Sequence, residues 1–326
     1  MRMDCLSNRK PWLDSAKGIC MLMVLLFHIE MYSFGTQRIS SLFTSFFMQA
    51  FFLLSGYTFV KDVNNFNWKS KIKSSLRGLA YPYFMILFLF GVIKVFIGTQ
   101  SVYDTIVQLI SGGGSWFVYV LLFVQILSSI AIAFLPYRIL CLWLSGIVFW
   151  LLGWFLCDKT LPSWSGSVSA ILRFYIFFII GVTLSVIEFS YIKYEKYLSV
   201  LCLLLFMVFW GIDNKINLDG LGALYGCRTY WTYGLCGLFG SLFLFFAIRQ
   251  WKGFLWLRFI GYNSLLFYFF NGCVIKILNK WMLSFAISVR IPLLLILSII
   301  TLSIFSVLIR CYVPFIIIMP SYKHEN

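Results

Sequence analysis

Charged residues are scarce in this chain. Only 11% of its 326 residues are Asp, Glu, Lys or Arg, whereas a soluble domain typically carries about 25%. Hydrophobic residues make up 61% of the sequence, and the mean hydropathy is +0.92. This composition excludes a soluble globular fold and is typical of a polytopic protein whose main solvent is the lipid bilayer. We therefore expect an all-α membrane protein.

Several recognisable motifs are also absent. The nine cysteines show no Cys-x-x-Cys spacing and lie mostly in apolar runs, so we expect neither a disulfide nor a metal site. No His-Glu-x-x-His, Gly-x-Ser-x-Gly, Walker or dinucleotide-binding motif is present, so the templates of soluble enzymes do not apply. The first apolar run is long and has no small-residue cleavage pattern after it, which favours a first membrane span over a cleaved signal.

Ten apolar runs approach the roughly 20 residues that a transmembrane helix needs. No loop is long enough for a second domain and no repeat has a fixed period, so residues 1–326 are expected to form a single integral-membrane domain. The expected spans are 13–31, 42–60, 76–97, 115–134, 138–156, 168–188, 196–212, 230–248, 258–279 and 291–313.

The basic residues predict how the chain is oriented in the membrane. The formal net charge is +15, but the cations are scattered between apolar runs, which indicates topology signals and not nucleic-acid binding. The N-terminal segment and every second segment after it hold 17 Lys and Arg residues, and the other segments hold six. The positive-inside rule then makes the N-terminal side cytoplasmic, and an even number of spans places both termini there. Three further cations, Lys94, Arg173 and Lys276, lie within apolar runs.

A histidine lies deep in the first apolar run. His28 is a candidate functional residue because ionisable residues inside membranes are rare and costly, and imidazole is suited to accept a proton from a hydroxyl. Lys17 precedes it by eleven residues, about three helical turns or 16 Å, and lies on nearly the same face. The alternative is a neutral imidazole bonded to a neighbouring helix, with Lys17 as an interfacial anchor.

Glu30 is a poor partner for His28. Two residues apart on a helix, the two side chains point about 200° away from each other. We therefore expect Glu30 at the outer surface, in contact with solvent. The group that orients His28 then comes from another helix, and Asn271 is one candidate.

A basic surface is expected at the cytoplasmic side. Asp14 and Lys17 are three residues apart and can pair on the first turns of the helix. Lys17 could instead join the basic residues of the expected inner loop 61–77 in binding a phosphorylated ligand through charge-assisted hydrogen bonds. These residues are Lys69, Lys71, Lys73 and Arg77. Binding of lipid headgroups is the alternative role for the same cations.

Two short segments are expected to shape the helix packing. Ser55-Gly56 permits close contact between membrane helices. The run Gly261-Tyr262-Asn263-Ser264 interrupts the ninth expected span near its inner end, where non-helical backbone is tolerated only if it is buried in protein or lines a cavity. Asn271 lies farther along that span.

Together these segments resemble the acyltransferase 3 family of integral-membrane O-acyltransferases, which modify cell-surface glycans. The Asp14-to-His28 run is similar to the family's Asp-x-x-[Arg/Lys]-Gly segment followed by a histidine, and its lysine matches the sugar-acetylase-like branch. Asn271 stands where many members have a histidine, so a proton relay through this position is not expected. The resemblance extends over most of the chain, in the segments WLDSAKGICMLMVLLFH, FFMQAFFLLSGYTF, LRGLAYPYF, GGGSWFVYVLLFVQIL and FIGYNSLLFYFFNG.

The resemblance implies an O-acetyltransferase of the cell membrane that uses acetyl-CoA as a co-substrate and a glycan as acceptor. The acceptor would be a polysaccharide or a lipid-linked oligosaccharide, with no metal and no permanently bound cofactor. His28 would be the catalytic base, and Lys17 with the cations of 69–77 would bind the donor. Supporting roles fall to Asp14, Ser55, Tyr81, Trp116, Arg173, Asn263, Tyr268 and Asn271.

Two other classes of function stay open at this point. A transporter or flippase of a glycan intermediate could use Lys94, Arg173 and Lys276 to line a path, although we find no inverted repeat. Such a protein would move its substrate without consuming acetyl-CoA. A structural membrane protein without catalytic activity is the third class, and it leaves the placement of His28 unexplained.

Overall fold

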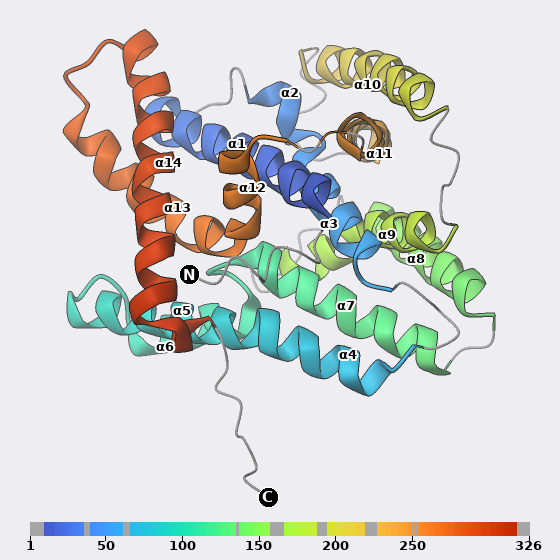
Figure 1. Cartoon of the computed structure of the whole chain (residues 1–326), viewed down its shortest axis with the longest axis horizontal. Coiled ribbons are helices and arrows are strands. Elements are labelled where there is room, and N and C mark those ends of the chain that lie inside the picture. Colours follow the sequence, from blue (N-terminus) through green and yellow to red (C-terminus); the bar gives the residue numbers. More distant parts are fainter. Residues whose placement is uncertain are drawn as a thin grey trace, which may run out of the picture. The chain divides into compact units, whose positions relative to one another are not determined.

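The computed structural model describes residues 10–35, 40–60, 66–134, 137–156, 166–187, 194–218, 227–249, 251 and 253–317. Helices dominate these ranges and no strand occurs in them, which confirms the all-α fold (Figure 1). The helices are α1 (Pro11–Phe34), α2 (Ser41–Thr44), α3 (Phe47–Tyr57), α4 (Trp68–Ser75), α5 (Tyr81–Phe96), α6 (Val102–Ser111), α7 (Trp116–Phe134), α8 (Arg138–Leu156), α9 (Gly166–Val186), α10 (Glu195–Leu218), α11 (Cys227–Arg249), α12 (Leu255–Tyr262), α13 (Ser264–Trp281) and α14 (Ile287–Tyr312). A π-helical turn (Leu76–Ala80) joins α4 to α5, and a 3-10 turn (Pro314–Ile316) follows α14.

Eight helical segments in the described ranges are long and apolar enough to cross a membrane, so the chain is a multi-pass membrane protein. The other two expected spans have a different form. Residues 42–60 correspond to α2 and α3, a shorter apolar stretch of Ser41–Tyr57, and residues 258–279 are divided between α12 and α13. The total of ten spans and the cytoplasmic termini therefore stay predictions.

The prediction of an inner loop over residues 61–77 is wrong for the part of it that the structure describes. Residues 68–80 are helical and continue into α5. Asn67 begins this helix, since its side chain accepts a hydrogen bond from the backbone N–H of Ser70 at 3.1 Å. The buried hydroxyl of Ser75 then donates to Gln125 of α7 at 2.6 Å, so the basic stretch has one face packed against a neighbouring helix. A second unexpected helix, α6, lies in the connection 98–114.

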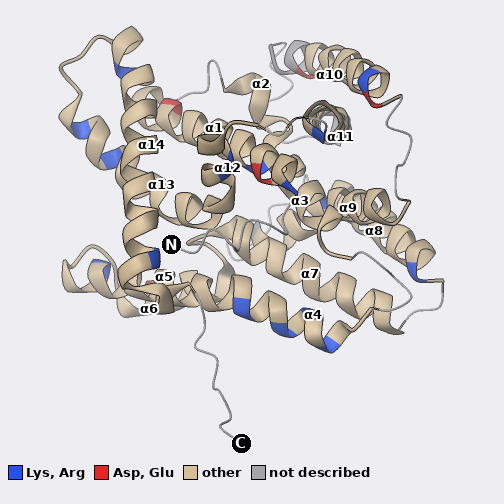
Figure 2. Ribbon diagram, in the orientation of Figure 1, with Lys and Arg blue, Asp and Glu red and all other residues tan. Residues whose placement is uncertain are grey.

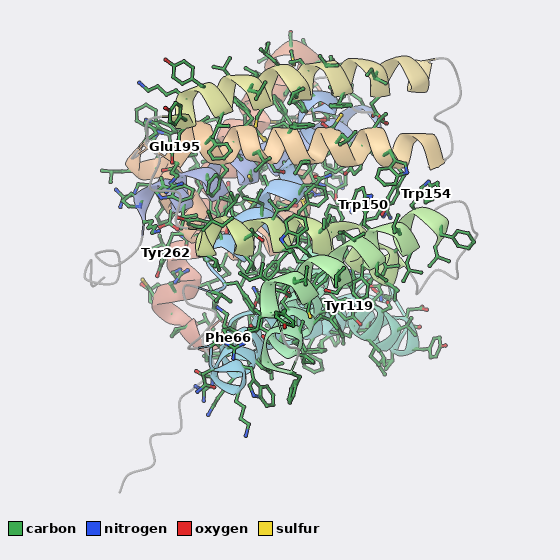
Figure 3. The ribbon with its side chains drawn as sticks, turned by 90° about the vertical axis from the view of Figure 1, so that its right-hand side faces the viewer. Phe66, Tyr119, Trp150, Trp154, Glu195 and Tyr262 are labelled. Carbon is green, nitrogen blue, oxygen red and sulfur yellow. The ribbon has the colours of Figure 1, made fainter. Side chains whose placement is uncertain are left out.

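The chain divides into two compact units, which are described separately. Unit 1 comprises residues 1–55 and 188–307, and unit 2 comprises residues 56–187 and 308–326. In unit 1, α1 packs against α11, α12 and α13, and α10 pairs along α11. Glu195, which Figure 3 labels, is at the start of α10. It lies 2.9 Å from the guanidinium of Arg249 at the end of α11 and ties the two helices together.

In unit 2, α7 packs against α4, α8 and α9. Gly56, which opens this unit, lies directly against the backbone of Phe178 in α9, with no room for a β-carbon. The close packing expected at Ser55-Gly56 is therefore confirmed for the glycine.

Two glycines bring α1 and α12 unusually close in unit 1. The backbone of Gly18 lies against the carbonyl of Leu257, and that of Gly261 lies against the carbonyl of Asp14. A methyl group at either glycine would overlap backbone atoms, which cannot move as a flexible side chain can. These contacts fix the start of α1 beside α12.

Candidate active site

The helices α12 and α13 follow α1 in the same direction. Near the start of α1, Gly261 of α12 lies against the carbonyl of Asp14, and near the end of α1 the amide of Asn279 in α13 donates to the carbonyl of Tyr32 at 3.0 Å. Both contacts join residues 247 positions apart, so at this register His28 lies level with Ile275, and Asn271 and Tyr268 lie about one and two helical turns before that level.

His28 is half-buried and lies between aromatic rings. Its ring centroid is 5.1 Å from that of Phe27 and 5.9 Å from that of Tyr32, with which it is stacked at an interplanar angle of 19°. Among the described residues the imidazole makes no hydrogen bond, so the alternative of a histidine satisfied by a neighbouring helix finds no support there.

A polar cluster lies one turn beyond His28. The ammonium of Lys276 is 5.0 Å from the centroid of the Tyr32 ring, and it lies within electrostatic range of His28. Asn279 is in contact with two residues of α1: its amide donates to the Tyr32 carbonyl, and its oxygen accepts from the Ser33 hydroxyl at 3.3 Å. The sequence reasoning missed Tyr32 and Asn279 and assigned Lys276 only to transport. Helical spacing was the available signal, because Tyr32 is four residues after His28 and Asn279 three after Lys276.

The expectation of a solvent-exposed Glu30 is wrong. Its side chain is fully buried, and its carboxylate accepts hydrogen bonds from both the backbone N–H of Ser40, at 3.0 Å, and the Ser40 hydroxyl, at 2.6 Å. Ser40, directly before α2, covers this carboxylate. Glu30 therefore stabilises the return of the chain toward α2.

Asn263 and Asn271 are both buried and both bond to their own helix. Asn263 interrupts the helix between α12 and α13, and its amide donates to the Phe259 carbonyl at 2.9 Å. The predicted interruption at this position is confirmed, and its backbone is buried in protein. The amide of Asn271 donates to the carbonyl of Tyr268 at 2.9 Å. No bond from Asn271 to His28 occurs in the described ranges, so stacking on Tyr32 is what the structure offers to orient the imidazole.

The start of α1 holds two other predicted residues. Asp14 is buried and Lys17 is half-buried, three helical turns before His28. Their mutual ion pair stays a prediction. Ser55, half-buried near the end of α3, is adjacent to the closely packed Gly56.

The predicted donor-binding cations of unit 2 lie on α4 and the π-helical turn (Figure 2). Lys69, Lys73 and Arg77 are exposed and spaced by four residues, so they share one face. We call these three residues the basic face. Lys71 is different, since it is half-buried and its ammonium lies 4.5 Å from the centroid of the Phe59 ring. The π-helical turn at Arg77 is a kind of irregularity that is frequent at functional sites.

The remaining predicted residues of unit 2 make local contacts. The Trp116 ring lies 5.5 Å from that of Phe174, next in sequence to Arg173. Arg173 donates to the Ser169 hydroxyl at 3.1 Å, one turn earlier on α9. The Tyr81 hydroxyl donates to the carbonyl of Phe315 at 2.7 Å and ties the start of α5 to the 3-10 turn.

The predicted site residues thus divide between the two units. Unit 1 brings Asp14, Lys17, His28, Asn263, Tyr268 and Asn271 onto neighbouring helices, and unit 2 holds Lys69, Lys71, Lys73, Arg77, Tyr81, Trp116 and Arg173. A basic surface shared by Lys17 and the basic face stays a prediction. The expected outer loop 213–229 lies partly in α10 and α11, and residues 219–226 are outside the described ranges.

Comparison with known proteins gives one result. A family model described as an acyltransferase domain, that of the acyltransferase 3 family, matches residues 10–312. This match covers nearly the whole chain and includes α1 through α14. No curated protein and no solved structure matches the chain.

Proposed function

Because the chain belongs to the acyltransferase 3 family and is a membrane acyltransferase, we propose that it transfers an acetyl group from cytoplasmic acetyl-CoA to a sugar hydroxyl of a cell-surface or secreted glycan, in the cell membrane. The observation that carries this proposal is the half-buried His28, which is stacked on Tyr32 and free of hydrogen bonds within the described ranges. A base in this state can accept a proton from a bound hydroxyl.

The donor is expected to bind from the cytoplasmic side. The basic face of α4 presents three exposed cations at four-residue spacing, which suits the phosphates of CoA. Lys17, at the start of α1, is the other cation that the sequence assigns to the donor. From there the pantetheine arm would extend along α1 for about 16 Å, three helical turns, to bring the thioester to His28.

The proposed chemistry is a direct acyl transfer. A ring nitrogen of His28 takes the proton of the sugar hydroxyl while the sugar oxygen attacks the carbonyl carbon of the thioester. The carbon–sulfur bond then breaks, an acetyl ester forms, and the proton held by His28 passes to the departing CoA sulfur. The surrounding protein and bilayer exclude water, which limits hydrolysis of the thioester. Transfer through a covalent acyl-histidine is the less favoured route.

The test is transfer of labelled acetyl from acetyl-CoA to glycan in membranes that contain either the unaltered protein or His28→Ala. We expect the loss of a general base to lower the rate by on the order of 100- to 10,000-fold. Lys94→Gln serves as a control, because this exposed cation on α5 has no role in the proposed reaction. Full transfer by His28→Ala would falsify the catalytic assignment, and mass spectrometry of the glycan would identify the acetylated position.

A further inference from the structure

Arg290 is a buried cation without a counterion in the described part of the chain. It lies in the first turn of α14, and its side chain is only 7% exposed. One guanidinium nitrogen donates to the carbonyl of Ser33 at 3.4 Å, while Nε finds no acceptor among the described residues. A buried charge is costly unless an opposite charge and hydrogen bonds compensate for it. The side chain is therefore suited to receive an anion.

A second cation lies at the same end of α1. Arg290 is in contact with Ser33 and Lys276 lies over the ring of Tyr32, so both cations meet the last turn of this helix. Asn279 bonds to both of these α1 residues and holds α13 against them. The ammonium of Lys276 is exposed and can be approached directly.

The carboxylate of Glu30 does not neutralise either cation. Glu30 lies in the same part of α1, but its carboxylate is bonded to Ser40. Within the described ranges the charge of Lys276 and Arg290 thus has no counterion and is available to a ligand, at the end of α1 opposite Lys17.

We propose that Arg290 and Lys276 bind an anionic group of the acyl acceptor, a carboxylate or a phosphate. This inference rests on the proposed function and specifies its acceptor. Ser33 is five residues beyond His28, about 8 Å along the helix axis. The anion would therefore lie within one or two sugar units of the hydroxyl that His28 deprotonates. The guanidinium is well suited to this task, since its planar fork binds carboxylate and phosphate through two parallel hydrogen bonds.

Two sources could supply the anion, and the experiment separates them. A carboxylate would belong to an acidic sugar, whereas a phosphate would belong to the carrier of a lipid-linked glycan. The full-length protein in membranes is given acetyl-CoA with one of three acceptors: a neutral oligosaccharide, the same oligosaccharide with one uronic acid unit, or the neutral one on a polyprenyl diphosphate. Initial rates give KM for each acceptor and for acetyl-CoA.

We expect one of the anionic acceptors to be preferred over the neutral one. Arg290→Gln should raise KM for that acceptor by on the order of 10- to 100-fold, the effect of losing a charged hydrogen bond. KM for acetyl-CoA should stay unchanged. Arg290→Lys should restore part of the affinity, Lys276→Gln should act in the same direction as Arg290→Gln, and Lys94→Gln should have no effect.

Three results would overturn the inference: equal use of all three acceptors, an unchanged acceptor KM in Arg290→Gln, or a raised KM for acetyl-CoA alone. The last result would assign these cations to the donor.

A binding measurement keeps the inference distinct from the proposed function. Methyl glucuronide or a short polyprenyl diphosphate should raise the Tm of the purified protein in detergent, and Arg290→Gln should abolish this shift. Stabilisation without any acetyl transfer would contradict the proposed function alone, and no stabilisation by either ligand would contradict the anion site.

Discussion

The rings of His28 and Tyr32 are stacked, with their centroids 5.9 Å apart. Tyr32 is one helical turn beyond His28, and its own position is held by Asn279 and Lys276 of α13. A residue of α1 itself therefore orients the imidazole, and α13 supports that residue from the side.

This arrangement predicts different effects for two substitutions of Tyr32. Tyr32→Phe keeps the stacked ring and should keep kcat near that of the unaltered protein. Tyr32→Ala removes the ring and should lower kcat by on the order of tenfold, which corresponds to the interaction energy of an aromatic pair. Labelled acetyl transfer at saturating acetyl-CoA measures both. Equal losses in the two variants would instead assign the role to the hydroxyl.

The glycine contacts between α1 and α12 predict a sharp difference in stability. Gly261→Ala should lower the free energy of unfolding by about 1–3 kcal/mol or more, because the added methyl would overlap the carbonyl of Asp14. Gly211→Ala is the matched control on α10, since nothing lies within 4 Å of its β-carbon position. It should be neutral or stabilise the helix by up to about 1 kcal/mol. Thermal unfolding of the purified proteins in detergent compares the two, and similar Tm values would show that α1 and α12 are farther apart.

Removal of the basic face should weaken donor binding specifically. We expect the combined change of Lys69, Lys73 and Arg77 to Gln to raise KM for acetyl-CoA by on the order of tenfold, since each exposed cation contributes a fraction of a kcal/mol. High salt should reduce the difference between the variant and the unaltered protein. Lys71→Gln is the comparison, because that ammonium already lies over Phe59 and should contribute less. An unchanged KM in the triple variant would favour lipid headgroups as the partners of these cations.

Glu30 should affect stability and not chemistry. Its carboxylate holds both the backbone and the hydroxyl of Ser40. In a double-mutant cycle, Glu30→Gln and Ser40→Ala should therefore show coupling of about 1.5–3 kcal/mol, as expected for hydrogen bonds to a charged group. The rate of acetyl transfer per folded molecule should stay near that of the unaltered protein. A rate as low as that of His28→Ala would make Glu30 part of the reaction.

The sequence alone determined the class of the protein and its family. Membrane-spanning helices are predictable from composition, because the bilayer leaves few alternatives to long apolar helices whose backbone is internally hydrogen-bonded. The interruption at Asn263 and the close packing of Gly56 followed from the same reasoning, since both depend on local residue type. His28 was found because an ionisable residue inside an apolar run is conspicuous.

Tertiary structure alone decided which side chains surround His28 and which are buried. Glu30 and Ser40 are separated by residues 31–39, and no periodicity predicts that the chain returns to cover the carboxylate. The contacts of Tyr32 with Lys276 and of Ser33 with Arg290 join residues some 250 positions apart, on α1, α13 and α14. Such contacts depend on how the helices pack, and packing is set by the shapes of all facing side chains together. Helical periodicity within one segment carries no information about the side chains that face it.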